Sequence, residues 1–404
     1  MFLVADSKSM GMGNYIDRII EADVKNGEIS GADICVIKNN EEIYRKQYGY
    51  SDKERHIAMP DDAIFRMYSM TKPVTAVAMM ILVERGIIDL NDPVSKYMDT
   101  YKNPKVLSNG KVIDAKREIL IKDIMNMTSG MSYPDSNTLA GRIVGDLFDV
   151  LQKEQREGKG RTTVEWCREL GKLPLEFNPG EEWRYGTSAD VCGAVIEIAS
   201  GKRLSEFMRE EIFEPLGMKD TDFYVPEEKW DRFTQVYEYT EDGILSPYEC
   251  RHLGITDYRT LPAFESAGAG LVSTINDYKR FALMLLNDGE YNGRTILHRK
   301  TMDYLRTPCV GDELLVNREW ESQRGYTYGN LMRIMKDIAQ AGTLGSVGEF
   351  GWDGWTGNYF LVDPAENMIM LYFIQRINGG KFTTINKLRN VIYGNLGEYI
   401  KRFE

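Results

Sequence analysis

The sequence has few of the residues that build disulfide frameworks, metal centres and histidine-dependent active sites. Its 404 residues include five cysteines and three histidines. The cysteines are scattered, odd in number and form no CxxC pair, which indicates reduced thiols rather than disulfides or a metal site. Only Cys250, two residues before His252, raises the question of a catalytic thiol. The histidines (His56, His252 and His298) are too far apart for a local metal site, and HExxH is absent.

Long apolar runs are also missing. No run approaches the length of a membrane span. The apolar stretch Phe2–Ala5 is far shorter than a signal-peptide core, and no Lys or Arg precedes it. A net charge of −11 repels phosphate backbones and gives no attraction to anionic lipid surfaces. We therefore expect a cytoplasmic protein that binds neither nucleic acid nor membranes.

Strand patterns lie at both ends of the chain, with helical patterns between them. Residues 13–26 show a helical stripe, and strands at Ala32–Ile37 and Ile43–Tyr48 flank Asn39-Asn40, a hairpin turn signal. The other expected helices are 73–84, 119–127, 142–156, 189–200, 204–214 and 383–400, and the other expected strands are 269–274, 326–334, 359–362 and 368–375.

These patterns predict an α/β protein of the α+β kind with two domains. Residues 1–85 and 266–404 would form a mostly antiparallel sheet covered by the terminal helices. Residues 86–265 would form an inserted, mostly helical domain, with the active site between the two.

The serine-hydrolase elbow GxSxG is absent, and three histidines make a Ser-His-Asp triad a weak candidate. A Ser-x-x-Lys pair, Ser69 and Lys72, offers a nucleophile activated without histidine. At a helix start, positions i and i+3 share one face. A lysine that loses its charge when buried can accept the serine proton. A second Ser-x-x-Lys, from Ser108 to Lys111, contains the turn dipeptide Asn-Gly and is not expected on a helix.

The residues after Lys72 are apolar on most faces of a helix, which predicts a buried helix over 73–84. Pro73 disfavours helical geometry at Lys72, so Ser69 is placed at the very start of this helix. From this motif alone, a catalytic pair and an N-capping serine beside a solvated lysine are equally acceptable interpretations.

The segment FRMYSMTKPVTAVAMMILVERGIIDLNDPVSKYM, residues 65–98, resembles the serine β-lactamase and penicillin-binding superfamily. It is most similar to the class C β-lactamase-like group, which includes the family VIII carboxylesterases. Further similar segments follow in order at 121–133, 177–197, 212–223, 265–289 and 350–364. The resemblance therefore covers about residues 13–377 and implies a β-lactamase/transpeptidase-like fold.

The resemblance implies roles for individual residues. Ser69 matches the acylated serine, Lys72 its partner lysine, and Tyr185 the tyrosine of a Tyr-x-Asn motif that takes part in proton transfer. Thr187 replaces the asparagine, keeping a hydroxyl but losing the paired donor and acceptor of an amide. This puts a substrate-orienting role for Thr187 in doubt. The alternative is that Tyr185 is a core aromatic residue, but its place after Asn178-Pro179-Gly180 in a matching segment favours the catalytic role.

Trp352-Asp353-Gly354 stands where β-lactamases have Lys-Thr-Gly and where the esterases of the group often have Trp-Gly-Gly. The backbone N–H groups of Ser69 and Trp355 would then form the oxyanion hole. Tyr68, Thr187, Trp352 and Gly354 are the expected substrate-binding residues. Core packing is the alternative role for both tryptophans.

Trp352 also indicates the substrate. β-Lactams carry a carboxylate that a lysine or arginine normally pairs with, whereas an indole is neutral. We therefore expect a serine hydrolase that cleaves small neutral carboxylic esters through an acyl-enzyme, with no metal or organic cofactor. The alternatives are a β-lactamase, D-aminopeptidase or acyltransferase of the same fold, or a non-catalytic acyl-binding or penicillin-binding protein. Acyl chain length and oligomeric state are left open.

Overall fold

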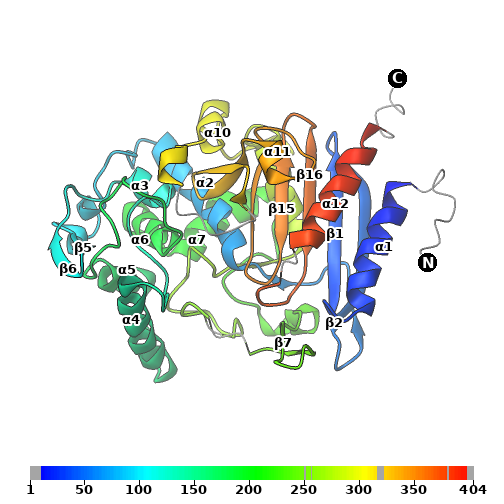
Figure 1. The fold of residues 1–404 in the computed structure, drawn as a ribbon, viewed down its shortest axis with the longest axis horizontal. Helices are drawn as coiled ribbons and strands as arrows, with labels where there is room; N and C mark the ends of the chain where they lie inside the picture. The colour runs from blue at the N-terminus through cyan, green and yellow to red at the C-terminus, as the bar shows by residue number, and fades with distance from the viewer. Residues whose placement is uncertain (1–10, 250–251, 256, 316–322, 380–381, 398–404) are drawn as a thin grey trace.

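Both ends of the chain contribute to one antiparallel sheet (Figure 1). The structure, a computed structural model, describes residues 11–249, 252–255, 257–315, 323–379 and 382–397. Within these, the strand order is β12-β13-β14-β15-β16-β1-β2-β3. The strands are β1 (Gly31–Lys38), β2 (Glu41–Asp52), β3 (Ile57–Ala58), β12 (Tyr326–Gly329), β13 (Met332–Met335), β14 (Phe350–Asp353), β15 (Tyr359–Asp363) and β16 (Met368–Phe373).

Strand β1 joins the two ends of the chain, because it pairs with β2 on one side and with β16 on the other. All eight of its residues are buried. Successive side chains of a strand point to opposite faces, and alternate residues of β1 accordingly belong to two different apolar clusters. The predicted hairpin is confirmed: Asn39 and Asn40 connect β1 to β2 with φ angles of 54° and 64°, the left-handed backbone of a tight hairpin turn.

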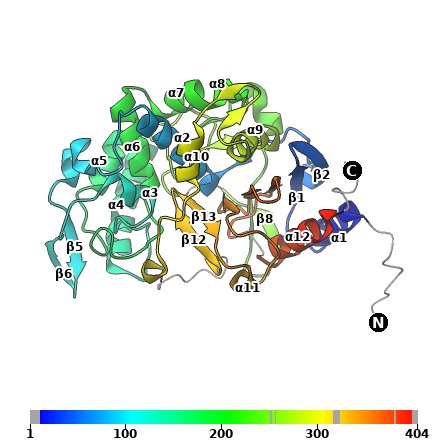
Figure 2. The ribbon, with the colours of Figure 1, turned by 90° about the horizontal axis from the view of Figure 1, so that it is seen from above.

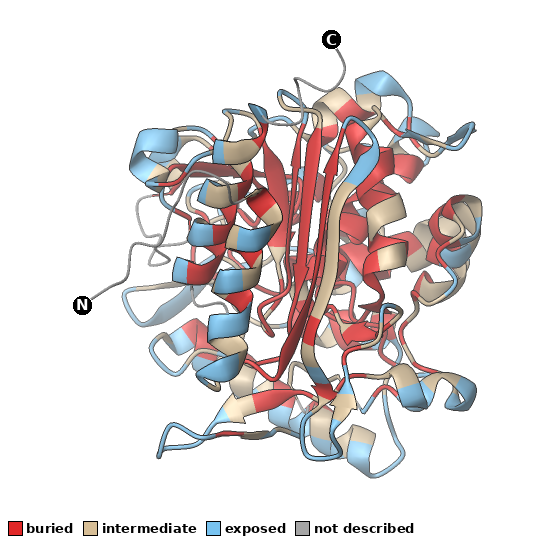
Figure 3. Ribbon diagram, turned by 90° about the vertical axis from the view of Figure 1, so that its right-hand side faces the viewer, coloured by how far each residue is buried: buried red, intermediate tan, exposed pale blue. Residues whose placement is uncertain are grey.

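Two terminal helices cover one face of the sheet. Helices α1 (Met12–Lys25) and α12 (Phe382–Asn395) lie side by side in both views (Figures 1 and 2). Ile16 and Ile20 of α1 and Leu388 and Ile392 of α12 share an apolar cluster with β1, β15 and β16. The central strands are buried along their length (red in Figure 3).

The opposite face of the sheet packs on α9 (Ile275–Leu286), and α2 (Thr71–Glu84) belongs to the same apolar core. One continuous apolar core runs from this face into the helical middle of the chain. The other helices are α3 (Ile121–Met125), α4 (Leu139–Arg156), α5 (Thr163–Leu170), α6 (Ser188–Ser200), α7 (Leu204–Met208), α8 (Glu214–Leu216), α10 (Arg299–Leu305) and α11 (Ile338–Ala341).

Short strand pairs complete the described part of the chain. Strand β4 (Phe65–Arg66) pairs with β9 (Val272–Ser273) and brings two distant segments together just before Ser69. The others are β5 (Lys105–Ser108) with β6 (Lys111–Asp114), β7 (Tyr237–Tyr239) with β8 (Leu245–Pro247), and β10 (Glu290–Tyr291) with β11 (Arg294–Thr295). Ser108 and Lys111 face each other across the β5–β6 turn, so the second Ser-x-x-Lys lies on a hairpin, as expected.

Several expected elements differ in detail. The single strand predicted over 326–334 is the hairpin β12–β13, which turns at Asn330 and Leu331 with φ angles of 47° and 63°. The helix predicted over 204–214 is interrupted by a π-helical turn at Arg209–Phe213. Strand β14 and helices α5, α9 and α10 were not predicted. Strand β14 has four residues, two of which are a glycine and an aspartate, so its sequence has too little strand preference to predict a strand. No helix in the described residues has the length and apolar character needed to cross a bilayer.

Candidate active site

Ser69 lies in a 3₁₀ turn, Tyr68–Met70, that leads directly into α2. Pro73 occupies the first turn of α2, where its missing N–H removes no helical hydrogen bond. The start of this helix is fastened from outside: the Tyr278 hydroxyl donates to the Met70 carbonyl at 2.8 Å. Thr75 Oγ1 also donates to the Ala267 carbonyl at 2.7 Å. The predicted position of Ser69, immediately before a buried helix, is therefore the position observed.

The Lys72 amine is buried beside Ser69. Its Nζ lies 3.1 Å from Ser69 Oγ, 2.8 Å from the Gly268 carbonyl oxygen and 3.1 Å from the Tyr133 hydroxyl. Lys72 has no exposed surface. This burial lowers the pKa of Lys72 to about 7, against the opposing effect of the negative charges of Asp190 and Asp353. A substantial fraction of the amine is therefore neutral at physiological pH.

Asp190 holds the loop that contacts Lys72. Its Oδ1 accepts hydrogen bonds from Ser266 Oγ at 2.7 Å and from the Gly268 N–H at 3.0 Å. These bonds keep the Gly268 carbonyl directed at the Lys72 amine. A side chain on Gly268 would start 3.0 Å from the Tyr133 hydroxyl, so glycine leaves room for that contact. Asp190 is itself 3% exposed, and burial raises the pKa of its carboxyl.

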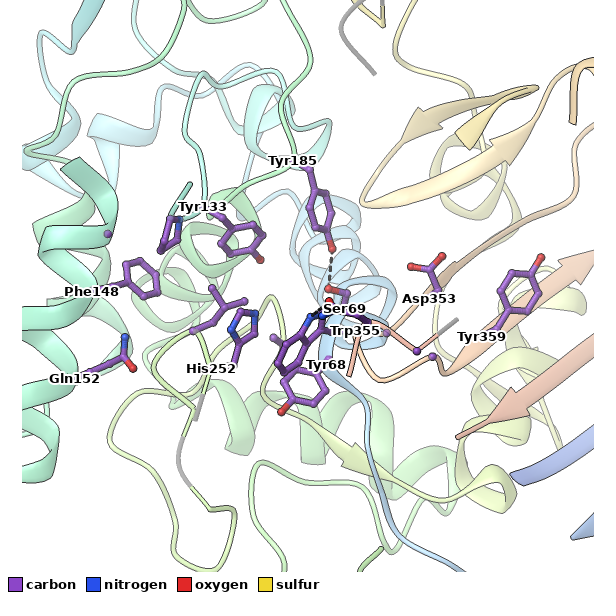
Figure 4. Close-up of a pocket in the computed structure, with 18 of the residues that line it drawn as sticks. Tyr68, Ser69, Tyr133, Phe148, Gln152, Tyr185, His252, Asp353, Trp355 and Tyr359 are labelled. Atoms are coloured by element: carbon purple, nitrogen blue, oxygen red, sulfur yellow. Dashed lines mark hydrogen bonds between the residues drawn. The ribbon is translucent and has the colours of Figure 1, made fainter. Parts of the chain in front are cut away.

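In Figure 4 the Tyr185 side chain points toward Ser69, and a hydrogen bond joins the two. Its hydroxyl donates to Ser69 Oγ at 2.7 Å and accepts from Trp352 Nε1 at 3.2 Å. Burial raises the pKa of Tyr185, and the two hydrogen bonds partly counter that rise. The next residue, Gly186, packs so closely that a Cβ there would lie 2.1 Å from the Met131 carbonyl oxygen. Only glycine permits this approach.

The indole of Trp352 decides the direction of this chain of hydrogen bonds. An indole N–H can only donate, so the Tyr185 oxygen must accept from Trp352, and its own proton is left for Ser69 Oγ. Protonated Lys72 donates to Ser69, to Gly268 and to Tyr133. When Lys72 loses a proton, one of its two remaining N–H bonds still donates to the Gly268 carbonyl, because a carbonyl oxygen can only accept. The lone pair of the amine then becomes available to the Ser69 hydroxyl.

The turn after β14 carries Gly354 and Trp355 up to the nucleophile. A Cβ on Gly354 would lie 2.6 Å from the Met67 carbonyl oxygen, so this backbone contact requires glycine. The Asn358 side chain donates to the Arg66 carbonyl at 2.9 Å and fastens the same turn to the segment before Ser69. Among the described residues, no group accepts the backbone N–H of either Ser69 or Trp355 in a hydrogen bond. Both donors are left for a ligand.

Tyr68 has a φ of 45°, an unfavourable value for a residue with a bulky side chain. Its ring packs edge-on against Trp355 with centroids 5.3 Å apart. Trp355 in turn stacks on His252, with centroids 4.0 Å apart and an interplanar angle of 18°, and donates its indole N–H to Asn378 Oδ1 at 2.9 Å. Burial lowers the pKa of His252 to about 4, so this imidazole is neutral at physiological pH.

Ser69 opens into a cavity of about 780 Å³. In Figure 4, Tyr133, Phe148, Gln152 and His252 lie to one side of Ser69, and Asp353 and Tyr359 lie to the other. The middle and the two ends of the chain therefore both contribute to its wall. The lining residues of interest are Tyr68, Ser69, Tyr133, Phe148, Asp149, Gln152, Tyr185, His252, Leu253, Asp353, Gly354, Trp355, Tyr359, Asn378 and Ile385.

The predicted site residues divide into two groups. Ser69, Tyr185, Tyr68, Gly354 and Trp355 line the cavity, and Lys72 lies directly behind Ser69.

Thr187 and Trp352 are not among the lining residues. Trp352 is fully buried beneath Tyr185, because alternation along β14 turns its side chain inward and that of Asp353 toward the cavity. Thr187 is also buried, at the start of α6, and its hydroxyl has no hydrogen-bond partner in the described residues.

Sequence reasoning missed Tyr133, Asp190 and Asp353. Tyr133 ends a segment of the family resemblance, and Asp353 departs from the glycine that esterases often have there. Both features could have indicated a residue of the site. Asp190 lies within the similar segment 177–197, but no motif in that segment distinguished it from other helical acidic residues. Cys250 lies outside the described residues. Within the described residues, no group of three His, Cys, Asp or Glu side chains is arranged to hold a metal ion.

Comparison with known proteins identifies the family of this chain. The Beta-lactamase family matches residues 16–392, nearly the whole chain. The chain belongs to the Beta-lactamase family. Its relatives include an uncharacterized protein of Mycobacterium tuberculosis, 32% identical over 364 residues and covering 86% of each chain. Esterase EstB of Burkholderia gladioli is 27% identical over 396 residues, covering 94% of each chain.

A solved structure supports the fold of this Beta-lactamase family member. EstCE1, described as a hydrolase with promiscuous acyltransferase activity, superposes with a TM-score of 0.80 at 22% identity, covering 95% of this chain and 98% of the other. At this identity the match establishes the fold alone. The resemblance and the fold class predicted from the sequence are confirmed.

The first prediction concerns pH. If neutral Lys72 is the base, kcat/KM for a nitrophenyl ester should rise with pH and reach half its plateau near pH 7, because the amine must lose its proton before it can accept one. Initial rates from pH 5 to 9 would measure this on a neutral substrate. The midpoint should survive His252→Asn, since His252 titrates near pH 4. A profile that is flat across pH 7 would contradict the role of Lys72.

The second prediction concerns Trp352. Trp352→Phe keeps an aromatic ring but removes the N–H that orients Tyr185. We expect kcat to fall about fivefold with little change in KM, since a hydrogen bond contributes roughly 1 kcal/mol. Trp230→Phe is the matched control, because its indole N–H donates to the Val225 carbonyl elsewhere. An unchanged kcat, or a change confined to KM, would show that Trp352 does not act through Tyr185.

Proposed function

We propose that this protein is a serine hydrolase that cleaves small neutral carboxylic esters through an acyl-enzyme on Ser69. One observation carries the proposal: Ser69 Oγ lies within hydrogen-bond distance of both Lys72 Nζ and the Tyr185 hydroxyl, at the wall of a large cavity. Membership of the Beta-lactamase family and the similarity to esterase EstB support it.

Acylation follows from the hydrogen-bond chain. Ser69 Oγ attacks the ester carbonyl carbon while its proton moves to the neutral Lys72 amine. Negative charge develops on the carbonyl oxygen, and the backbone N–H groups of Ser69 and Trp355 are free to donate to it; such donors are worth about 3 kcal/mol each in comparable sites. The C–O bond to the alcohol then breaks. The departing oxygen receives a proton through Tyr185, which Lys72 replenishes.

Deacylation repeats the sequence with water in place of the serine. Lys72 and Tyr185 take a proton from the water as it attacks the acyl carbon, and the Ser69 oxygen leaves with a proton. The carboxylic acid is released and the resting hydroxyl is restored. In each half-reaction the Lys72 amine accepts a proton from the attacking hydroxyl and returns it to the departing oxygen. Acylation and deacylation therefore use the same side chains.

The charges at the cavity favour an ester over a β-lactam. No Lys or Arg is among the described residues that line the cavity, whose formally charged members are Asp149 and Asp353. A β-lactam would bring its carboxylate into this wall without a cation to pair with, which is costly. An uncharged ester needs only the two N–H groups and apolar contacts.

The third prediction tests the nucleophile. A fluorophosphonate should add one covalent group to the protein on Ser69, located by mass spectrometry of the digested chain. Ser69→Ala should lose this adduct and reduce ester turnover by about 10⁴-fold or more while the protein stays folded. Ser108→Ala, the matched control in the other Ser-x-x-Lys, should keep wild-type activity. Turnover by folded Ser69→Ala protein would overturn the proposal, and an adduct without turnover would favour a non-catalytic acyl-binding protein.

The fourth prediction separates the enzymatic alternatives. We expect kcat/KM for nitrophenyl butyrate to exceed that for nitrocefin by at least about tenfold, a difference of roughly 1.4 kcal/mol. A D-alanine nitroanilide and an added alcohol acceptor, assayed in parallel, test D-aminopeptidase and acyltransferase activity. Nitrocefin as the better substrate would make the protein a β-lactamase. Ester products dominating in the presence of the alcohol would make it an acyltransferase.

A further inference from the structure

Asp353 presents negative charge to the cavity despite being paired with a cation. Its Oδ2 accepts from Arg333 Nη1 at 2.8 Å, but the Asp353 side chain is 39% exposed whereas that of Arg333 is 3% exposed. Arg333 does not line the cavity. It is held beneath the wall, with its guanidinium 4.6 Å from the ring centroid of Tyr359 and 5.7 Å from that of Trp352. The ion pair therefore turns its negative end toward a bound ligand.

A second carboxylate and several aromatic rings complete this environment. Asp149 follows Phe148 on α4 and also lines the cavity. The rings of Tyr68, Trp355 and Tyr359 also line the cavity, and in Figure 4 Tyr359 lies on the same side of Ser69 as Asp353. Aromatic faces and carboxylates are the two kinds of group that bind a substituted ammonium ion, through cation–π attraction and charge. Lys72 lies behind Ser69, faces Gly268 and Tyr133, and is not among the residues that line the cavity.

We propose that Asp353 gives this active site a preference for esters that carry a quaternary or primary ammonium group, and that Asp149 adds to this preference. The inference rests on the proposed function and refines its substrate class: the reacting ester group remains uncharged, and the cation lies elsewhere in the same molecule. A carboxylate that served only to anchor Arg333 would be expected beside it in the interior, where the pair is least screened. Asp353 instead stands at the cavity wall.

The experiment compares cationic esters with neutral molecules of the same shape. The first pair is acetylcholine and its isostere in which carbon replaces the quaternary nitrogen. These two esters differ in the charge of the alcohol portion. The second pair is the ethyl ester of trimethylammonio-butanoate and its carbon isostere, which differ in the charge of the acyl portion. The measured quantity is the ratio of kcat/KM between cationic and neutral members of each pair. Because both members use the same nucleophile and base, effects on Lys72 cancel in this ratio.

For the wild type we expect a ratio of about ten in at least one pair, the order of one cation–π contact together with one partly exposed charge pair. Asp353→Asn should lower the ratio to about a third or less of its wild-type value, and Asp149→Asn should lower it by a smaller factor. Asp353→Glu should retain it. Asp146→Asn, an exposed residue of the same helix that does not line the cavity, is the control for net charge and should leave the ratio unchanged.

A ratio of one or less in both pairs, or a ratio that Asp353→Asn leaves unchanged, would overturn the proposal. Should Asp353→Asn fail to fold because Arg333 loses its ion pair, the salt dependence of the wild-type ratio decides: a decline toward high salt supports the charge contact, and a salt-independent ratio overturns it. Failure here remains distinct from failure of the proposed function, since Ser69-dependent turnover of the neutral isosteres would persist.

Discussion

The burial of one lysine amine beside one serine hydroxyl is the constraint around which this protein is organised. Bringing the pKa of Lys72 from 10.5 to about 7 costs several kcal/mol of folding stability, because the interior must hold an amine that water would keep charged. The buried α2 and the core around it offset that cost. The Gly268 carbonyl accepts the shortest of the three hydrogen bonds of the amine, and Asp190 holds the Gly268 backbone in place. Residues that are far apart in the sequence therefore hold the Lys72 amine within hydrogen-bond distance of Ser69 Oγ.

Strand β14 and the turn after it connect the sheet to the chemistry. Alternation along four residues directs Trp352 inward to Tyr185 and Asp353 outward to the cavity. The turn then brings Gly354 against the Met67 carbonyl, and the next residue, Trp355, lines the same cavity as Ser69. Pairing with β15 and β13 holds this strand in register. A slip of one residue would exchange the inward and outward side chains, so the integrity of the sheet is a requirement of the site as well as of the fold.

The sequence contained enough to predict the sheet from both termini, the buried helix after Ser69, and the hairpin at Asn39-Asn40, because each has a local periodic or turn signal. The family resemblance supplied Tyr185 and the turn at Gly354. What it could not supply were contacts made only by the folded chain. Asp190 looks like any helical acidic residue until the loop at Gly268 packs on it. Trp352 was expected to contact substrate, but its direction depends on the register of a strand too short to predict.

The same burial explains why a lysine, and not a histidine, is suited to this site. Burial lowers the pKa of Lys72 from 10.5 to about 7 and that of His252, at the same cavity, from 6.5 to about 4. An amine with a pKa near the working pH is both largely available as a free base and strong enough to take a serine proton. An imidazole with a pKa near 4 is always free but far too weak a base. Where burial shifts pKa values this far, a lysine therefore reaches the basicity that a histidine has when it is exposed to solvent. The chain has three histidines, and the side chains hydrogen-bonded to its nucleophile are a lysine and a tyrosine.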